Sequence, residues 1–361
     1  MPLLAVADEL KKKNYADIEI FYLGPKSPWI GEFENRDIPV YRIAESKLRR
    51  YFSLANFIDI PKFFWSIVQA LFRLYLLMPD VVFSKGGPGA LAVVLAAKFY
   101  MIPIVIHESD SVPGLTNKLS AKFAKRIGIA FESAAGYFDA RKTFFSGNPI
   151  RLELTGESSG NAVFKSELGF NKDEDLIFVW GGSQGAARIN RFIFENLETF
   201  LKKYQIFHQV GENNLKEAQA IIDDLLKGFP EENRRRYRLT GFLDVHGVRT
   251  ALSAADVVLA RASAGSVFEV AFFGKPSILI PLEGSAGDHQ RLNAYEYSKI
   301  GAAIVIEEAN LKPNIVSTQI DSLLNDKNKY AAMAAAAKRF AKPEAAAIIA
   351  QEIIKLANLA G

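Results

Sequence analysis

The chain has 361 residues, more than the roughly 250 that a single hydrophobic core usually supports, so two domains are expected. Hydrophobic residues make up 49% and charged residues 23%, which excludes disordered, collagen-like and disulfide-scaffold proteins. A net charge of +4 does not indicate a nucleic-acid partner, and the lack of cysteine excludes disulfides, thiolate metal sites and cysteine nucleophiles.

A helix is predicted at the start of the chain, with Pro2 in its first turn. The lysines at 11–13 follow the apolar residues instead of preceding them, so the segment does not have the pattern of a signal peptide and a cytosolic protein is expected. The strand that should feed this helix is not in the sequence. We expect either a domain that begins with a helix or a chain that lacks its true start.

The most apolar stretch, Phe63–Met78, is shorter than a typical spanning helix and contains Gln69 and Arg73, so a transmembrane segment is not favoured. Basic residues precede it and aromatic residues open it, a mixture typical of a surface that dips into an anionic bilayer. The residues of this candidate membrane surface are Arg49, Arg50, Phe63, Phe64 and Trp65. A thickly buried core helix fits the pattern equally well, and both interpretations stay open.

Short apolar runs alternate with helical patterns along the rest of the chain. The predicted strands are Ile18–Leu23, Val81–Ser84, Ile104–His107, Leu176–Trp180, Ile206–Val210, Val257–Ala260 and Ser277–Pro281. This alternation indicates an α/β protein whose parallel sheets are connected by crossover helices.

An internal repeat sharpens that prediction. The segment Asp80–Lys85, a glycine-rich turn, a helix and Pro103–Ile106 are echoed by Asp256–Arg261, a small-residue turn, a helix and Pro276–Ile280. Two such βαβ units predict two Rossmann-like, doubly wound parallel-sheet domains that face each other across a cleft. We expect the first domain at 1–148 and the second at 149–361, with the last helix returning to the first domain.

The run Val179–Ala186 reads as a strand, a glycine turn and the start of a helix, which suits a phosphate or diphosphate. It lacks the Gly-Lys-Ser/Thr of a nucleoside-triphosphate loop, so ATP hydrolysis is not favoured. It also matches Gly-x-Ser-x-Gly, so a hydrolase with Ser183, Asp256 and His289 is a rival interpretation, as is a glycine turn without a ligand.

Polar residues follow other predicted strands. Small residues at 262–266 allow close approach of backbone to a ligand, and Glu269 could accept two ribose hydroxyls or merely complement a helix dipole. The run Asp288–Ala294 is expected to open another helix. Helix capping would explain the presence of Asp288 there, but not that of Gln290. His107-Glu108-Ser109-Asp110 is a candidate for acid–base work or hydroxyl recognition, or a plain polar loop.

Five motifs in order resemble those of the undecaprenyl-diphospho-muramoylpentapeptide β-N-acetylglucosaminyltransferases, a glycosyltransferase family 28 group. They are His107-Glu108-x-x-x-Val112-Pro113-Gly114-Leu115-Thr116-Asn117, Ser146-Gly147-Asn148-Pro149-Ile150-Arg151, Gly181-Gly182-Ser183-Gln184-Gly185-Ala186, Arg261-Ala262-Ser263-Ala264-Gly265-Ser266-Val267-Phe268-Glu269 and Asp288-His289-Gln290-x-x-Asn293-Ala294. The resemblance implies the two-domain GT-B fold and transfer of N-acetylglucosamine from UDP-N-acetylglucosamine to the 4-hydroxyl of the polyprenyl-diphosphate-linked muramoylpentapeptide. It further implies inversion, no metal or other cofactor, a role in peptidoglycan synthesis, and peripheral attachment to the anionic cytoplasmic face of the cell membrane.

The resemblance also assigns roles to residues. The diphosphate loop would be Gly181, Gly182, Ser183, Gln184 and Gly185, with Arg151 near the nucleotide. Uracil and ribose would be held by Leu243, Ala264, Gly265, Ser266, Val267, Phe268 and Glu269, and the donor sugar by Asp110 and Gln290. His107 and Glu108 would line the acceptor side as the candidate catalytic residues.

Two departures from the family pattern matter. The family opens with a strand and a Gly-Gly-Thr-Gly-Gly-His loop that this sequence lacks, so we expect poor activity from the chain as it stands. Asp110 replaces a usual Asn, which we expect to alter donor affinity because an ionised carboxylate only accepts hydrogen bonds. A transferase acting on another membrane lipid, such as a diacylglycerol, and an inactive UDP-sugar-binding protein remain alternatives.

Overall fold

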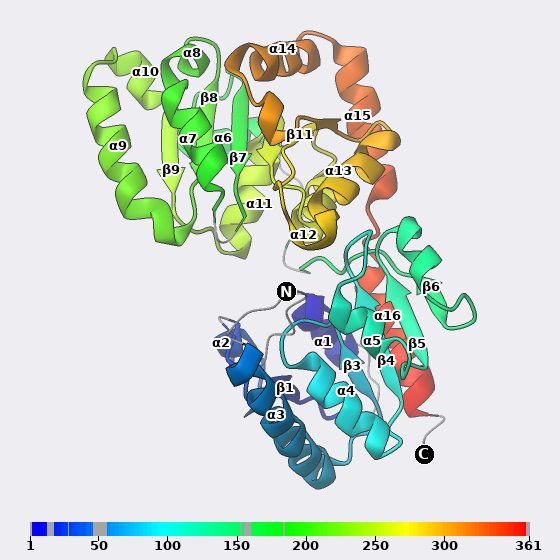
Figure 1. Cartoon of the computed structure of the whole chain (residues 1–361). Helices are drawn as coiled ribbons and strands as arrows, with labels where there is room; N and C mark the ends of the chain where they lie inside the picture. Colours follow the sequence, from blue (N-terminus) through cyan, green and yellow to red (C-terminus); the bar gives the residue numbers. More distant parts are fainter. Residues whose placement is uncertain are drawn as a thin grey trace. The chain divides into compact units, whose positions relative to one another are not determined.

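The computed structural model describes residues 2–12, 18–27, 29–45, 56–151, 154, 160–182 and 185–358, without the side chains of 56–58. The chain divides into two compact units. Unit 1 comprises Met1–Arg151 and Lys342–Gly361, and unit 2 comprises Leu152–Ala341 (Figure 1). The helix α16 (Ala345–Ala357) therefore belongs to unit 1 although it follows unit 2 in the sequence.

Unit 2 contains a six-stranded sheet in which every neighbouring pair is parallel. Its strands are β7 (Leu176–Trp180), β8 (Gln205–Gln209), β9 (Tyr237–Thr240), β10 (Val257–Ala260), β11 (Ser277–Leu279) and β12 (Ile304–Val305). The order is β12-β11-β10-β7-β8-β9, so the first strand lies in the middle and the chain winds outward first on one side and then on the other. This is the doubly wound Rossmann order, and its switch point lies between β7 and β10.

Helices cover both faces of this sheet (Figure 1). They are α6 (Asn161–Glu167), α7 (Ala187–Glu195), α8 (Leu197–Leu201), α9 (Leu215–Lys227), α10 (Glu231–Arg235), α11 (Val245–Ala254), α12 (Ala264–Phe273), α13 (His289–Lys299), α14 (Pro313–Leu324) and α15 (Lys327–Phe340). Because β7 is covered on both faces, all five of its residues are buried, and its sequence is accordingly apolar throughout. Ile177 and Val179 pack in one core cluster, while Phe178 stacks on Phe207 and Trp180.

Unit 1 contains two separate parallel sheets. One pairs β1 (Tyr22–Gly24) with β2 (Val40–Arg42), and the other has the order β3 (Val82–Ser84), β4 (Ile104–Glu108), β5 (Arg126–Ile129) and β6 (Thr143–Phe145). The helices of this unit are α1 (Pro2–Lys12), α2 (Ile30–Glu34), α3 (Asn56–Leu77), α4 (Ala90–Phe99), α5 (Leu115–Ser120) and α16.

Two helical layers enclose the strands of unit 1. Ile104 and Ile106 of β4 pack in a cluster with α3 and α4, whereas Val105 between them packs with α1 and α16. Arg126 of β5 also pairs with Glu352 of α16 at 2.6 Å. These contacts account for the return of the last helix to unit 1.

The structure confirms the predicted α/β class and the parallel strands, and it corrects their extents. The first strand begins at Tyr22 instead of Ile18, and β4 extends through Glu108. The strands that sequence analysis did not predict, β2, β5, β6, β9 and β12, contain two to four residues each and include arginine or threonine in most cases. Such short strands carry too little periodicity to be distinguished from loops.

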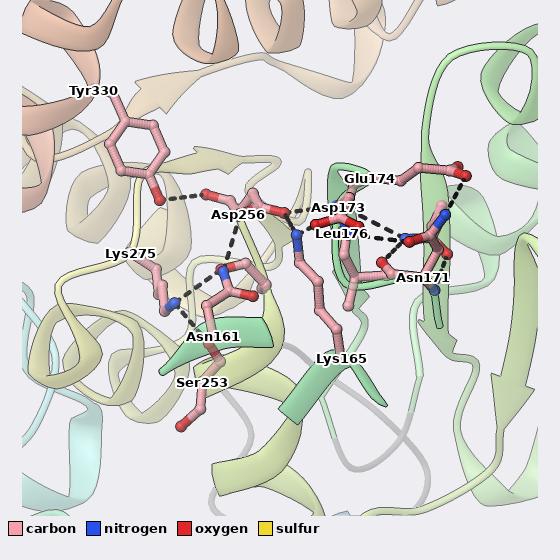
Figure 2. A network of polar contacts seen from close by, with 12 residues as sticks. Asn161, Lys165, Asn171, Asp173, Glu174, Leu176, Ser253, Asp256, Lys275 and Tyr330 are labelled. Carbon is pink, nitrogen blue, oxygen red and sulfur yellow. Dashed lines mark hydrogen bonds and ion pairs between the residues drawn. The ribbon is translucent and has the colours of Figure 1, made fainter. Parts of the chain in front are cut away.

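A polar network closes the amino-terminal edge of the unit 2 sheet (Figure 2). Asp256, just before β10, pairs with Lys165 at 2.7 Å and accepts hydrogen bonds from Leu176 N–H and the Asn161 side chain. Lys275 donates to the carbonyls of Ser253 and Ala255 nearby, and burial lowers its pKa to about 8. The buried charges are thus paired and hydrogen-bonded, which is what makes their burial tolerable.

Candidate functional site

The glycine turn after β7 lies at the carboxyl end of the central strand of unit 2. At Gly185 the φ angle is +75°, and an added Cβ would lie 2.0 Å from the carbonyl oxygen of Val210, so only glycine fits there. Gly185 N–H donates to Gly182 C=O at 2.9 Å, which closes the turn in front of α7. Gly181 and Gly182 are part of the described turn, whereas Ser183 and Gln184 lie outside the described residues.

The start of α12 lies beside this turn, because β10 pairs with β7 and Ala260 is the register partner of Trp180. Ser263 caps α12 by accepting a hydrogen bond from Ser266 N–H. Gly265 is exposed, and an added Cβ would meet nothing within 4 Å. Both helix N-termini therefore lie at the switch point of the sheet, where doubly wound folds bind ligands.

In the first two turns of α12, most side chains belong to the core, and for these residues only the backbone is available to a ligand. Ala264, Ser266, Val267 and Phe268 are buried, and Phe268 packs against Phe340 with ring centroids 4.8 Å apart. Glu269 is only 8% exposed and lies in the second turn of α12, and the first turn of that helix contains no acidic residue. The helix dipole acts mainly in the first turn, so dipole compensation does not explain Glu269.

The loops around α13 correct one prediction. Asp288 does not cap α13 with its side chain, but pairs with Arg291 at 2.5 Å and has a left-handed backbone. Gln290 accepts a hydrogen bond from Leu282 N–H at 3.1 Å, so its side chain orients the loop after β11. Leu243, between β9 and α11, is half-buried.

In unit 1, His107 lies at the carboxyl end of β4 and is fully buried. Its Nε2 donates to the Gly147 carbonyl at 3.0 Å, and its Nδ1 lies 3.4 Å from Ser109 Oγ. Burial lowers the pKa of His107 to about 3, so the ring is neutral. This arrangement anchors the loop at 146–148 and leaves the ring no exposed edge toward a substrate.

Glu108 organises the loop that follows it. Its carboxylate accepts hydrogen bonds from Asp110 N–H (3.0 Å), Gly114 N–H (3.3 Å) and the Asn117 amide (2.8 Å). Burial raises the pKa of Glu108, and the hydrogen bonds oppose that shift. The loop held in this way presents Asp110, which is half-buried.

Lys85 and Asn117 are two further polar residues at this end of the unit 1 sheet that were not expected from the sequence as separate site residues. Lys85 follows β3, and burial lowers its pKa while the nearby charges of Asp110 and Glu108 raise it. Asn117 donates to Glu108 and lies where a Cβ on Gly86 would come within 2.5 Å of its Oδ1. The repeat offered a signal, because Ser84-Lys85-Gly86-Gly87 occupies the place of Ala260-Arg261-Ala262-Ser263.

Other predictions from the sequence concerned three arginines, metal binding and a hydrolase triad. Arg151 is buried at the end of unit 1, whereas Arg49 and Arg50 lie outside the described residues. Among the described residues no three His, Cys, Asp or Glu side chains are close enough to hold a metal ion. The rival triad is wrong, because Asp256 lies at the amino end of β10 and is about 16 Å from the carboxyl end that bears the glycine turn.

The helix α3 has one face in the core and one face in solvent. Ser66, Ala70 and Leu74 are buried, and α3 packs on α4. The opposite face exposes a stripe of large apolar side chains, hereafter the α3 stripe: Ile60, Phe64, Trp65, Val68, Phe72, Tyr75 and Leu76. Phe63 is half-buried. By length and composition Asp59–Leu77 could cross a bilayer, with a mean hydropathy of 1.2, but its buried face binds it to the protein.

Two Rossmann-like parallel units, with a glycine turn and helix N-termini at a strand switch point, define a GT-B glycosyltransferase architecture. Family models agree, since the glycosyltransferase family 28 N-terminal domain matches residues 1–129 and the C-terminal domain matches residues 176–349. The chain belongs to glycosyltransferase family 28.

The chain is also similar to individual proteins of known name and structure. The chain is 36% identical over 334 residues to a Bacillus anthracis UDP-N-acetylglucosamine–N-acetylmuramyl-(pentapeptide) pyrophosphoryl-undecaprenol N-acetylglucosamine transferase, covering 91% of this chain and 89% of that protein. The crystal structure of Acinetobacter baumannii MurG is 25% identical with a TM-score of 0.72, over 98% of this chain and 95% of that one. A Neisseria meningitidis UDP-GlcNAc 2-epimerase bound to UDP-GlcNAc shares the fold, with 14% identity and a TM-score of 0.70, over 98% and 96%.

Proposed function

We propose that this chain transfers N-acetylglucosamine from UDP-N-acetylglucosamine to a polyprenyl-diphosphate-linked N-acetylmuramyl-pentapeptide, the reaction that the names of its relatives state for those proteins. The observation that carries the donor half is the pairing of β7 with β10, which brings the glycine turn and the start of α12 to one edge of the sheet. Backbone N–H groups at two helix N-termini suit a nucleoside diphosphate.

The donor would be held by residues of unit 2. The amides of Gly181 and Gly182 would face the diphosphate, and Gly185, whose N–H donates to Gly182 C=O, would shape the loop around it. Glu269 would accept the two ribose hydroxyls. The N-terminus of α12 would stabilise the charge that develops on the leaving UDP, a role that a metal ion plays in other enzymes. Since the side chains of Val267 and Phe268 are in the core, they would contribute to nucleotide binding through backbone only.

In unit 1, the geometry favours positioning roles for His107 and Glu108. His107 is buried with its ring nitrogens near Gly147 and Ser109, and the Glu108 carboxylate already accepts three hydrogen bonds from N–H groups of the protein. Asp110, which they hold in place, would be the side chain that reads the donor sugar. Arg151, Leu243 and Gln290 keep the roles implied by the resemblance: Arg151 near the nucleotide, Leu243 with the uracil, and Gln290 at the sugar.

The acceptor has a polyprenyl chain, so the enzyme must work at a membrane surface. We propose that the α3 stripe inserts its apolar side chains into the cytoplasmic leaflet, with the exposed Lys62 and Lys98 beside anionic headgroups. This makes the protein peripheral at the cytoplasmic face of the membrane. The proposal requires no nucleic acid and no cofactor.

The test is transfer of radiolabelled N-acetylglucosamine from its UDP donor to the lipid-linked muramyl acceptor, with diacylglycerol as the competing acceptor. Glu269→Gln should weaken UDP-N-acetylglucosamine binding by about 10- to 100-fold, because the ribose hydroxyls lose a charged acceptor. The matched control, Glu198→Gln on the exposed face of α8, should bind the donor normally.

Each other outcome has a defined meaning. Transfer to diacylglycerol alone would replace the proposed acceptor. Donor binding without transfer to either lipid, also in a chain extended by the codons upstream of Met1, would indicate a UDP-sugar-binding protein. Normal donor binding by Glu269→Gln would remove Glu269 from the nucleotide site.

A further inference from the structure

Glu308 joins two arginines that lie far apart in the chain. It follows β12, in the short helix η5 (Glu308–Asn310), and is only 7% exposed. Its Oε1 lies 2.5 Å from Arg261 Nη1, and its Oε2 lies 3.6 Å from Arg188 Nη1. Its backbone carbonyl also accepts a hydrogen bond from Arg188 Nη2 at 3.2 Å. We refer to Glu308, Arg261 and Arg188 as the Glu308 cluster.

The Glu308 cluster lies at the same edge of the unit 2 sheet as the glycine turn. Arg261 directly follows β10, Arg188 is the second residue of α7, the helix after β7, and Glu308 follows β12. In a parallel sheet the carboxyl ends of all strands meet at one edge. Given the strand order β12-β11-β10-β7, the cluster extends from the edge strand to the central strand.

Both arginines also hold the loop between β11 and α13, residues 280–288. Arg261 Nη1 donates to the carbonyl of Ile280 at 3.1 Å, at the start of this loop. Arg188 Nη1 lies 4.0 Å from the carboxylate of Glu283, further along the loop. A guanidinium carries several donors in one rigid plane, so one arginine can fix two acceptors relative to each other. The position of the loop thus depends on where Glu308 holds the arginines.

The side chain of Gln290 depends in turn on this loop. Its Oε1 accepts a hydrogen bond from Leu282 N–H at 3.1 Å, and its own backbone N–H donates to Ser285 Oγ at 3.3 Å. A displaced loop would take Leu282 N–H away from Gln290 Oε1, and the amide group would then lose its fixed orientation. A side chain that must be ordered again on binding costs affinity. Glu308 is therefore connected to Gln290 through the arginines and the loop.

The elements proposed to hold the nucleotide have anchors outside the Glu308 cluster. Ser263 caps α12 by accepting a hydrogen bond from Ser266 N–H. Asn190 anchors α7, since its side chain donates to Val210 C=O at 2.9 Å and its Oδ1 lies 3.1 Å from His208 Nε2. Disruption of the cluster should therefore affect the 280–288 loop more than the glycine turn or α12.

We infer that Glu308 is a positioning residue for the donor sugar. It holds Arg261 and Arg188, which hold the 280–288 loop, and the loop orients Gln290. The inference rests on the proposed function, in which Gln290 binds the sugar of UDP-N-acetylglucosamine. Glu308 acts on the sugar through this loop and not by contact, because its carboxylate is buried between the arginines. It determines how well the site distinguishes UDP-N-acetylglucosamine from UDP.

The test compares the binding of UDP-N-acetylglucosamine with that of UDP, measured by isothermal titration calorimetry. Glu308→Ala should weaken UDP-N-acetylglucosamine binding by about tenfold but UDP binding by less than about twofold, because only sugar contacts are lost. Glu308→Gln should return the affinity for UDP-N-acetylglucosamine to within about threefold of the parent, since the amide oxygen still accepts a hydrogen bond from Arg261. A general loss of stability would weaken the binding of both ligands alike.

The matched control is Asp256→Ala. Asp256 is also a carboxylate in an ion pair of unit 2, with Lys165, but at the amino-terminal edge of the sheet (Figure 2). Asp256→Ala should lower the thermal midpoint and leave the ratio of the two affinities unchanged. Arg188→Ala serves if Glu308→Ala does not fold, because the Arg188 side chain is half-exposed. It should weaken UDP-N-acetylglucosamine binding alone, by about threefold, as expected for a half-exposed ion pair.

The outcomes separate this inference from the proposed function. If the parent binds both ligands, and Glu308→Ala and Arg188→Ala weaken both equally or leave both unchanged, Glu308 does not position the sugar. The inference is then overturned, and the proposed function stands. If the parent binds neither UDP nor UDP-N-acetylglucosamine, the proposed function fails and the inference fails with it.

Discussion

At the scale of single residues, polar side chains that follow the carboxyl ends of strands have different roles, and their burial and hydrogen-bond partners distinguish these roles. His107 is sealed with both ring nitrogens near protein partners, and Glu108 is filled by three donors, so both hold loops in place. Glu269, in the second turn of α12, has no role in compensating the helix dipole there. The same kind of location therefore yields positioning residues in unit 1 and a ligand candidate in unit 2.

Gly185→Ala should destabilise unit 2. The new methyl group would lie 2.0 Å from Val210 C=O, and the φ of +75° is unfavourable for alanine, so we expect a loss of about 2 to 4 kcal/mol. Thermal or urea unfolding measures the change. Gly265→Ala is the matched control, since its methyl group meets nothing within 4 Å and should leave stability unchanged or slightly higher. A Gly185→Ala protein as stable as the parent would contradict the loop geometry.

At the scale of elements, α3 and β7 show that an apolar sequence does not by itself indicate burial. Both segments are strongly apolar, but β7 is covered on both faces and α3 on one face only. Trp65 is 58% and Phe64 is 62% exposed on the α3 stripe. An apolar surface of this extent is typical of a binding surface.

From the membrane docking proposed for the α3 stripe, Phe64→Ser combined with Trp65→Ser should reduce binding to anionic liposomes by about tenfold or more, because two large apolar side chains would be lost from the inserted surface. Co-sedimentation with phosphatidylglycerol vesicles measures the effect. Since both side chains are largely exposed, the thermal midpoint should stay within a few degrees of the parent. Val163→Ser on α6 is the control. Unchanged liposome binding would move the membrane surface away from α3.

At the scale of the whole molecule, each unit has a buried neutral histidine. His107 lies in unit 1 and His208 in unit 2, where its nitrogens lie 2.9 Å from Tyr237 Oη and 3.1 Å from Asn190 Oδ1. Burial lowers the pKa of both histidines to about 3. The unfolded chain, with an ordinary histidine pKa near 6.5, binds more protons than the folded chain between about pH 3 and 6.5.

Stability should therefore fall as the pH falls from 6.5 toward 3 and should not change from this source above about pH 7. Each histidine contributes at most about 1.4 kcal/mol per pH unit, or about 2 kcal/mol at pH 5. Unfolding in urea at pH 7 and pH 5 measures the difference. His208→Gln should lower stability at pH 7 but show a smaller loss between pH 7 and pH 5. An equal loss in the variant would contradict the assignment to His208.

Some elements could be predicted from the sequence and others could not. Long apolar strands such as β7 and β10, and the repeat that relates β3 to β10, were predictable because their apolar periodicity is local. Strands such as β6 and β12 were not, since their pairing depends on neighbours distant in the chain. The motif residues were found from sequence, but Lys85 and Asn117 became visible as partners of Glu108 only once the loops were folded.

The sequence by itself determined the α/β class, the parallel strands, the glycine turn before α7 and the family, because these depend on local residue patterns. Only the tertiary structure decided that His107 is fully buried, that Asp256 lies at the opposite edge from the glycine turn and that one face of α3 is exposed to solvent. Burial and strand order arise from contacts between distant segments, which no local pattern encodes.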